Sequence, residues 1–451
     1  MKHLARREFL KKIANYTALG TAAPLALSLS SMAQASSFTA TDYKALVCIY
    51  FYGGNDYANT VVPYDTNSYN LYKSLRPTIA LDRTTLANTV LTPSQPLGNG
   101  LQFALEPNLL PLMSLFNNNQ MSVLLNIGTL IQPTTKAQYM ANSVPLPPRL
   151  FSHIDQQKFS QSLTNLEVDG WGGQMESLLM SANSNSLFSS ISAAGQTLFL
   201  TGNSVTQYQV SSSGATAINA LSGSPFGSSS VATALRSIIS TPLNQPMSDQ
   251  VTTTVNRAIS AQSSLSTEIG STTPFGALFP TGNSLASQLQ IVARIIKANQ
   301  AIGAKRQVFF VSLGGFDTHQ HIATVHPQLM SQVGDAISAF QSSLINMNLL
   351  QNVFSFTASD FGRTLTSNGD GTDHGWGSHH FTFGGPTTTS KFIGTAPTLA
   401  NNGVDDVGQG RLIPTTGMDQ LAMAMGTWLG VSSTDMATVL PNSKNFHAIK
   451  L

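Results

Sequence analysis

The feature that most constrains the fold is a repeated alternation of long apolar runs with helix-like repeats of apolar residues. Residues 45–52 and 121–127 are nearly continuous apolar runs, and each is followed by a glycine. Apolar residues recur at helical spacing over 285–296 and 329–344, ahead of further apolar runs at 308–313 and 353–358. Continuous apolar strands are buried on both faces of a sheet, and strands that alternate with amphipathic helices pair in parallel. The pattern therefore predicts an α/β fold with a doubly wound, mostly parallel sheet.

The N-terminal residues predict an export signal. Arg6 and Arg7 are followed by Phe9 and Leu10, and then by a weakly apolar stretch over residues 13–29. This order is typical of twin-arginine signal peptides, and small residues at 33 and 35 offer a cleavage site before residue 36. An amphipathic N-terminal helix is the alternative. We expect residues 1–35 to direct the folded chain to the twin-arginine export machinery and then to be removed, which leaves a periplasmic, secreted or cell-surface protein.

The remaining residues, 36–451, are expected to form one domain. No charged or proline-rich linker divides them, and no later segment is apolar enough for a transmembrane anchor. Serine- and threonine-rich runs dilute the hydrophobic pattern between about residues 180 and 283, which indicates a polar insertion. Charged residues make up only 10% of the chain, so the surface should be largely neutral and polar.

Charge and cysteine content exclude some classes of partner and bond. Without residues 1–35 the chain carries 18 Lys and Arg against 20 Asp and Glu, so neither nucleic acid nor an anionic membrane is an expected partner. Cys48 is the only cysteine, so no internal disulfide can form. It lies within the first apolar run, where a small core residue is the expected role and a reactive thiol the alternative.

Three aspartates follow the ends of separate apolar runs. Asp56, Asp317 and Asp360 each lie within a few positions of such an end. The carboxyl ends of parallel strands meet at one edge of the sheet, where ligands of open α/β folds bind. We therefore expect these carboxylates to come together, although any one of them could instead be a turn or helix-cap residue.

Histidines accompany two of these aspartates. The chain has nine histidines, and those near Asp317 and Asp360 are the candidate ligands: His319, His321, His374, His379 and His380, with Asp373 beside them. Carboxylate and imidazole ligands suit zinc, and also manganese or iron(II), so one or two divalent ions are expected. The alternative is that these histidines are solvated or satisfy buried carbonyl groups. His326 and His447 are not expected to be ligands.

Several motifs, taken together, resemble an exported family known as domain of unknown function 1501, of the alkaline phosphatase and sulfatase superfamily. The motifs are Tyr52-Gly53-Gly54-Asn55-Asp56, Ser152-His153-Ile154-Asp155-Gln156-Gln157, Gly314-Gly315-Phe316-Asp317-Thr318-His319, Ser359-Asp360-Phe361-Gly362-Arg363-Thr364, and Asp373-His374-Gly375-Trp376-Gly377 with His379-His380-Phe381. The resemblance covers most of the mature chain. It implies an alkaline phosphatase-like fold.

The resemblance also implies roles for individual residues. It implies a two-metal site that includes Asp56, Asp317, Asp360 and the histidines, with a hydroxyl nucleophile. Ser152 is the candidate nucleophile, with His153 beside it as a second candidate catalytic residue, and a helix N-cap is the alternative role of Ser152. Arg363 would clamp a phosphate or sulfate oxygen, and a surface ion pair is the alternative. The superfamily usually has His where Phe361 stands, so a further ligand must come from residues 373–380.

These observations predict a metal-dependent hydrolase of phosphate or sulfate esters, with a small-molecule or glycan ester as substrate. The alternative is a non-catalytic exported binding or assembly protein with a structural or decayed metal site. In that role the polar insertion would contact a glycan or another exported protein.

Overall fold

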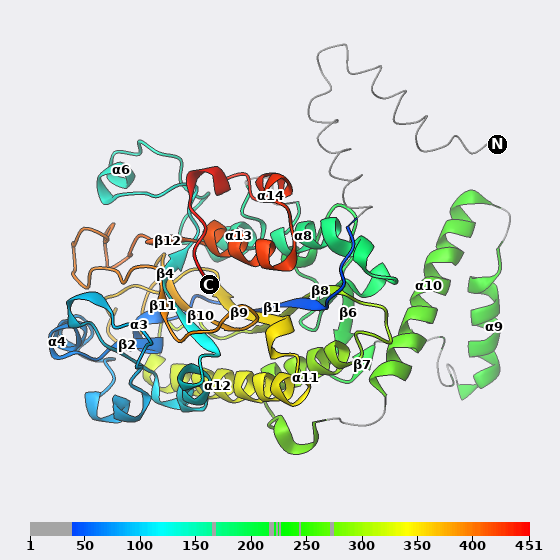
Figure 1. The fold of residues 1–451 in the computed structure, drawn as a ribbon, viewed down its shortest axis with the longest axis horizontal. Coiled ribbons are helices and arrows are strands. Elements are labelled where there is room, and N and C mark those ends of the chain that lie inside the picture. Colours follow the sequence, from blue (N-terminus) through cyan, green and yellow to red (C-terminus); the bar gives the residue numbers. More distant parts are fainter. Residues whose placement is uncertain are drawn as a thin grey trace, which may run out of the picture.

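The computed structural model describes residues 38–164, 168–215, 221, 224, 227–242, 245–270 and 275–451. The predicted signal peptide lies outside the described residues. Figure 1 shows a central sheet between two layers of helices, with one pair of helices extending to the side. Within the described part of the chain, no helix is long and apolar enough to cross a membrane.

The centre of the sheet consists of parallel strands. β1 (Lys44–Phe51) pairs in parallel with β8 (Arg306–Leu313) on one side and with β9 (Val353–Ser359) on the other. β10 (Ser378–Gly384) runs antiparallel to β9 and to β4 (Met121–Gly128). The full order is β11-β4-β10-β9-β1-β8-β5-β6-β7, and β12 also pairs with β4. The predicted mixed α/β fold with a mostly parallel sheet is confirmed, and four predicted apolar runs are β1, β4, β8 and β9.

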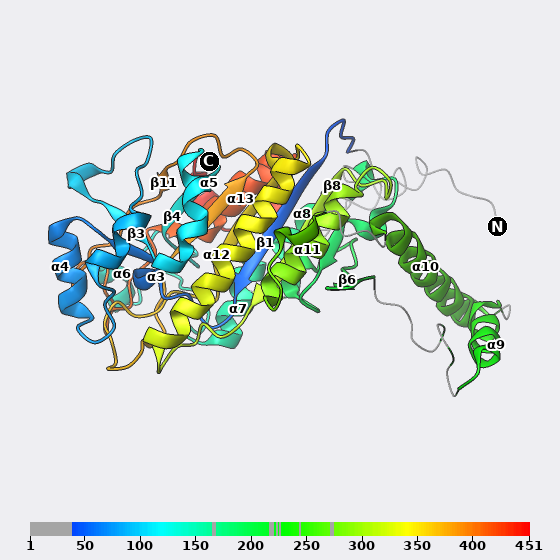
Figure 2. The same cartoon turned by 90° about the horizontal axis from the view of Figure 1, so that it is seen from below.

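Helices cover both faces of the sheet, which explains why its strands are apolar throughout. One face is covered by α11 (Ser284–Lys297), α12 (Ile322–Asn346) and α5 (Met113–Asn117), as Figure 2 shows. The other carries α8 (Trp171–Leu179), α13 (Met418–Leu429) and α14 (Ser433–Val439). In β1, Val47 and Ile49 pack into one hydrophobic core, and Leu46 and Cys48 pack into the other. Cys48 is thus a buried core residue with a free thiol.

Residues 180–283, where the insertion is predicted, divide into two parts. β5 (Ser190–Ser192), β6 (Tyr208–Ser211) and β7 (Gly214–Ala215) extend the central sheet beyond β8. The helices α9 (Ser229–Ser240) and α10 (Pro246–Ile269) then lie side by side and project away from the sheet, as Figures 1 and 2 show. The first part belongs to the sheet, and the second projects from it, although Ala261, Leu265 and Ile269 of α10 pack into the hydrophobic core.

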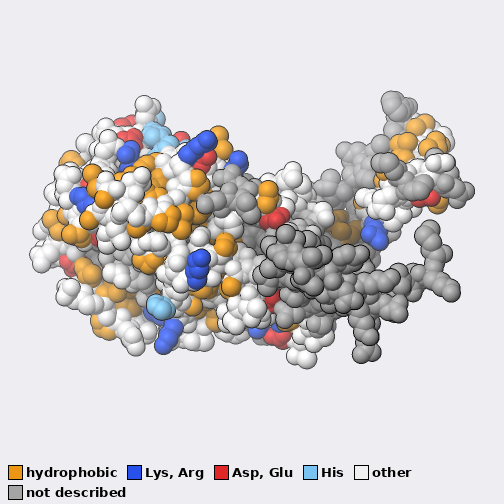
Figure 3. Space-filling view, turned by 90° about the horizontal axis from the view of Figure 1, so that it is seen from above, with side chains coloured by type: hydrophobic (Ala, Val, Ile, Leu, Met, Phe, Trp, Pro, Cys, Tyr) orange, Lys and Arg blue, Asp and Glu red, His pale blue; other side chains and the backbone are white. Residues whose placement is uncertain are grey.

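Shorter helices and strands complete the fold. Their bounds are α3 (Tyr57–Thr60), β2 (Val61–Pro63), α4 (Thr66–Leu75), β3 (Phe103–Leu105), α6 (Lys136–Met140), α7 (His153–Ser162), β11 (Phe392–Ile393) and β12 (Thr416–Gly417). Figure 3 shows scattered charged side chains among hydrophobic and neutral polar ones on one face of the molecule. This agrees with the low charge of the sequence.

A buried carboxyl group in α8 makes the stability of the fold pH-dependent. Burial raises the pKa of Glu176 from 4.5 to about 8, and its Oε2 atom has no hydrogen-bond partner among the described residues. A folded pKa above the unfolded one means that folding binds a proton. The stabilisation that proton binding by Glu176 contributes is therefore complete below about pH 4.5 and is lost as the pH rises toward 8.

We expect the free energy of unfolding of Glu176→Gln, measured by urea unfolding, to fall less between pH 5 and 8 than that of the wild type. Parallel pH curves for the two proteins would contradict this prediction.

Candidate metal centre

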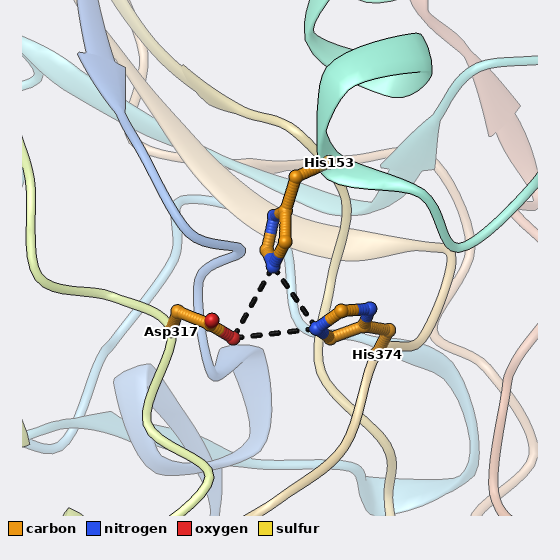
Figure 4. Close-up of side chains that lie close together, drawn as sticks. All are labelled: His153, Asp317 and His374. Atoms are coloured by element: carbon orange, nitrogen blue, oxygen red, sulfur yellow. Dashed lines mark hydrogen bonds and ion pairs between the residues drawn. The ribbon is translucent and has the colours of Figure 1, made fainter.

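Three loops bring one carboxylate and two imidazoles together at the carboxyl edge of the sheet. His153 is the first residue of α7, Asp317 follows β8, and His374 lies between β9 and β10. Figure 4 shows the three side chains pointing toward one another. His153 Nε2 lies 3.2 Å from Asp317 Oδ1 and 3.0 Å from His374 Nε2, and His374 Nε2 lies 3.3 Å from Asp317 Oδ1. Such spacing suits neighbouring ligands of an ion about 2.0–2.2 Å from each.

His319 adds a fourth donor to this cluster. Its Nε2 atom lies 3.0 Å from Asp317 Oδ1 and 2.9 Å from His374 Nε2. The side chains of Asp317 and His319 are 46% and 42% exposed, whereas those of His153 and His374 are 23% and 25% exposed. Solvent, and hence a small molecule, can therefore reach the cluster from the side of Asp317 and His319.

The other nitrogen of each imidazole has its own partner. Nδ1 of His153 lies 2.7 Å from Asp360 Oδ2, and Nδ1 of His319 lies 3.1 Å from Asp373 Oδ1. Nδ1 of His374 donates to the carbonyl oxygen of Phe151 over 2.7 Å. Carbonyl and carboxylate oxygens accept, so each neutral ring carries its proton on Nδ1 and a lone pair on Nε2. Three lone pairs thus converge on one carboxylate oxygen, and such outer partners are characteristic of metal-ligating histidines.

This donor set fits a divalent cation. Lone pairs on His153 and His374 Nε2 repel each other at 3.0 Å unless a proton or a cation lies near both atoms. The Oδ1 atom of Asp360, which lies behind His153, is buried and has no partner among the described residues. Nitrogen and oxygen ligands of this kind suit zinc best, and manganese and iron(II) as well. Elsewhere in the described residues, no other group of three or more His, Cys, Asp or Glu side chains converges in this way.

The pKa shifts within the cluster favour the metal-binding forms of Asp317 and His374, whereas that of His153 favours its protonated form. Burial raises the pKa of Asp317, but the hydrogen bond and charge of Arg363 outweigh burial and lower it below its usual value. Burial lowers the pKa of His374. Burial also acts to lower the pKa of His153, but the hydrogen bond to Asp360 and the charges of Asp360 and Asp317 raise it overall. Asp317 is therefore ionised and His374 neutral near pH 7, as metal ligands must be.

Glycines allow the loops of this edge to approach one another. Gly53 has a φ of 116°, and a Cβ atom there would lie 2.3 Å from the backbone nitrogen of Asp317. A Cβ atom on Gly371 would lie 2.3 Å from the carbonyl oxygen of His319. Isolated backbone bridges pair Asn55 with Gly362 and Arg363 with His374. The glycine-rich motifs of the sequence are thus the places where these loops touch.

Asp56 does not join the cluster, contrary to the expectation from its position after β1. Its carboxylate forms a two-pronged ion pair with Arg76, with nitrogen–oxygen distances of 2.6 and 2.9 Å. Both side chains are fully buried. Arg76, which no sequence motif indicated, lies 20 positions further along the chain at the end of α4. The buried guanidinium occupies both oxygens of Asp56, so this carboxylate has a structural partner in place of an ion.

Three of the predicted histidine ligands also lie elsewhere. His321 is exposed and pairs with Asp370, at 3.0 Å. His379 Nδ1 accepts a hydrogen bond from the backbone of Asn126, and its ring lines an apolar pocket of about 280 Å³ that does not include the cluster. His380 Nδ1 lies 3.1 Å from Thr357 Oγ1. Burial lowers the pKa of both His379 and His380 to about 3, so they are neutral core histidines. His326, not expected to be a ligand, is also buried away from the cluster.

The predicted catalytic residues lie beside the cluster in altered roles. Arg363 is fully buried and donates to Asp317 Oδ1 over 2.6 Å, and also to the carbonyl oxygens of Gly53 and Thr372. It orients the carboxylate and is not free to clamp a substrate oxygen. Ser152 is the N-cap residue of α7, and its hydroxyl donates to the carboxylate of Asp155. His153, which was expected to be catalytic, is part of the cluster, while Asp360 and Asp373 are outer partners of histidines.

Other residues of the site were missed from the sequence. Phe151 contributes only its carbonyl oxygen, which no side-chain pattern reveals. Gln157 and Asn368 donate to Asp360 and Asp373, both through side-chain amides. Gln157 is four positions after His153, so helical spacing within the 152–157 motif could have indicated it.

Phe361 stands where the resemblance described above leads one to expect a histidine ligand. Its ring is buried and lies 4.7 Å from the ring of His153 and 5.0 Å from that of His374, measured between centroids. With phenylalanine at position 361, a further ligand was expected from residues 373–380. His374 does come from this loop, but it joins the same cluster as His153. The described residues therefore gather one cluster in place of the two-metal site expected from the resemblance.

Comparison with known proteins gives a family but no activity. No curated protein matches the chain. A solved structure titled "Crystal structure of Ps i-CgsB in complex with k-i-k-neocarrahexaose" is 10% identical, with a TM-score of 0.35, and the match covers 87% of this chain and 73% of that one. A likeness this low carries no argument about function. The profile of the family "Protein of unknown function (DUF1501)" matches residues 43–429. The motifs that meet at the metal centre lie within this range, and the chain belongs to the DUF1501 family.

Proposed function

We propose that this protein is an exported, metal-dependent hydrolase of phosphate or sulfate esters, with one cation held by His153, Asp317 and His374. The observation that carries the proposal is the convergence of imidazole Nε2 atoms on Asp317 Oδ1 at 3.0–3.3 Å in a part of the molecule that solvent reaches. The sheet and the order of its strand-end motifs support an alkaline phosphatase- and sulfatase-like fold as part of this proposal.

Residues around the metal centre fix the orientation of the ligands, and an aromatic ring excludes water from one side of them. A bound zinc ion would polarise an ester oxygen and lower the pKa of a nucleophilic hydroxyl or water. Asp360, Asp373 and the Phe151 carbonyl fix the three imidazoles, and Arg363 fixes Asp317. Phe361 excludes water from one side of His153 and His374. Ser152, the residue before His153, is the candidate hydroxyl nucleophile.

A non-catalytic role for the cation is the second candidate. The observation that favours it is that Nδ1 of each imidazole has its own hydrogen-bond partner. Such partners orient the ligands of a structural metal ion as well as those of a catalytic one. The exposure of Asp317 and His319 favours the hydrolase, since structural sites are usually closed.

Metal content and ester turnover together test the proposal. We expect the mature protein to bind close to one ion per chain and to hydrolyse nitrophenyl phosphate or sulfate esters, with turnover lost on chelation and restored by zinc, manganese or iron(II). Elemental analysis and a colorimetric panel of monoesters and diesters measure both. Tight metal binding without turnover of any ester, together with loss of folding on chelation, would favour the structural role instead.

A further inference from the structure

An ester anion needs a cationic partner at this site, and Arg363 is not available for that purpose. Its side chain is fully buried, and each of its three nitrogens already donates within the protein. We propose that Arg411 binds the anionic group of the substrate. This inference rests on the proposed function, because it names the residue that would recognise a phosphate or sulfate group beside the metal centre.

Arg411 is held directly against the residues that position His374. Its Nε–H donates to the carbonyl oxygen of His374 over 3.0 Å. Its guanidinium carbon lies 4.6 Å from the ring centroid of Phe151, in a cation–π contact. The carbonyl of the same Phe151 fixes Nδ1 of His374. Two independent contacts therefore place this guanidinium beside the backbone of His374 and the ring of Phe151, at the edge of the metal centre.

The outer face of Arg411 is free. The side chain is partly exposed, and neither terminal amino group has a hydrogen-bond or ion-pair partner among the described residues. Arg76 and Arg363 are buried in ion pairs with Asp56 and Asp317, and Arg149 contacts Asp155 over 3.3 Å from a side chain that is 80% exposed. A guanidinium with two unused amino groups matches two oxygens of a tetrahedral oxyanion.

The charge of the cluster also calls for a further cation. Asp317, Asp360 and Asp373 contribute three negative charges, which a divalent ion and Arg363 would balance. An incoming ester anion would thus enter a site without surplus positive charge. Arg411 is the neighbouring group that supplies the additional positive charge. Because of this charge, the site would bind anionic esters in preference to neutral ones.

The backbone at Phe151, whose ring contacts Arg411 and whose carbonyl oxygen accepts from His374, has an uncommon conformation. Phe151 has a φ of 72°, which is uncommon for a bulky residue. Its ring contacts both Arg411 and Trp376, and the centroid of the Trp376 ring is 6.4 Å away. Strained residues of this kind cluster at functional sites, where the surrounding contacts hold them in place.

Binding of inorganic phosphate and sulfate to the zinc-loaded protein tests the role of Arg411 without depending on turnover. We expect Arg411→Gln to weaken binding of either anion about tenfold or more by calorimetry, and to raise KM for anionic esters with a smaller effect on kcat. Arg411→Lys should fall between the two proteins. The control variant is Arg149→Gln, which replaces an exposed arginine near Ser152. It should change anion affinity less than about twofold.

The outcomes separate this inference from the proposed function. Anion affinity that falls in Arg411→Gln but not in Arg149→Gln supports the role of Arg411, even where no ester is hydrolysed. Wild-type anion affinity and wild-type KM in Arg411→Gln overturn it, even where the hydrolase is fully active. Loss of bound zinc in both Arg411 variants also overturns it, because Arg411 would then act only by positioning His374.

Discussion

Asp317→Ala is expected to abolish stable metal binding, and His374→Ala to weaken it severely. Asp317 Oδ1 is the one anionic donor that contacts His153, His319 and His374. Without it only neutral nitrogen atoms remain. Loss of an outer-shell partner already costs about 10–100-fold in metal affinity, so loss of a direct ligand should cost more than about 100-fold. Elemental analysis after dialysis, and competition with a chromogenic chelator, measure the affinity.

His326→Ala and His379→Gln are the matched controls for this experiment. Both residues are buried histidines that lie away from the cluster, so they report the effect of losing an imidazole from the core. Asp317→Ala also leaves the buried Arg363 without its carboxylate, so His374→Ala serves as the second test, free of that complication. Equal metal content in all of these variants would contradict the assignment of the metal centre.

The layered fold follows from the sequence because its signals are local. Each central strand is a continuous apolar run, and alternate residues of β1 pack into different cores. Helical spacing over 285–296 and 329–344 corresponds to α11 and α12. The strands β5 and β6 were not foreseen, since Ser190–Ser192 and Tyr208–Ser211 are short and polar. They join the sheet by pairing with β8 and with each other, which is a tertiary effect.

The metal centre could be predicted only in part, because a strand-end position does not fix the direction of a side chain. Asp317, Asp360 and His374 do reach one edge of the sheet, as parallel pairing requires. Asp56 reaches the same edge but forms a buried ion pair with Arg76. The spacing of residues in the sequence does not reveal this partner. His379 and His380 lie within β10, where a strand buries both of its faces. Their assignment as metal ligands, which followed from their closeness to His374 in the sequence, therefore differs from their place in the structure.

Arg76→Ala is expected to destabilise the protein by about 3–5 kcal/mol, the usual cost of leaving one charge of a buried ion pair uncompensated. Arg76 donates to Asp56, to Asn59 and to the carbonyl oxygens of Thr364 and Leu365, all from a fully buried side chain. Its removal leaves the Asp56 carboxylate in the core without a positive partner. Urea unfolding at pH 7 measures the loss.

The double variant Asp56→Asn with Arg76→Met distinguishes an ion pair from a metal ligand. With both charges gone, no uncompensated charge remains, so part of the stability should return relative to Arg76→Ala. Metal content should stay at the wild-type level in the double variant and in Asp56→Asn alone, because both oxygens of Asp56 face Arg76. If Asp56→Asn instead releases the ion while the protein stays folded, then Asp56 is a ligand as its position after β1 suggested. The pairing with Arg76 would in that case belong to the metal-free state.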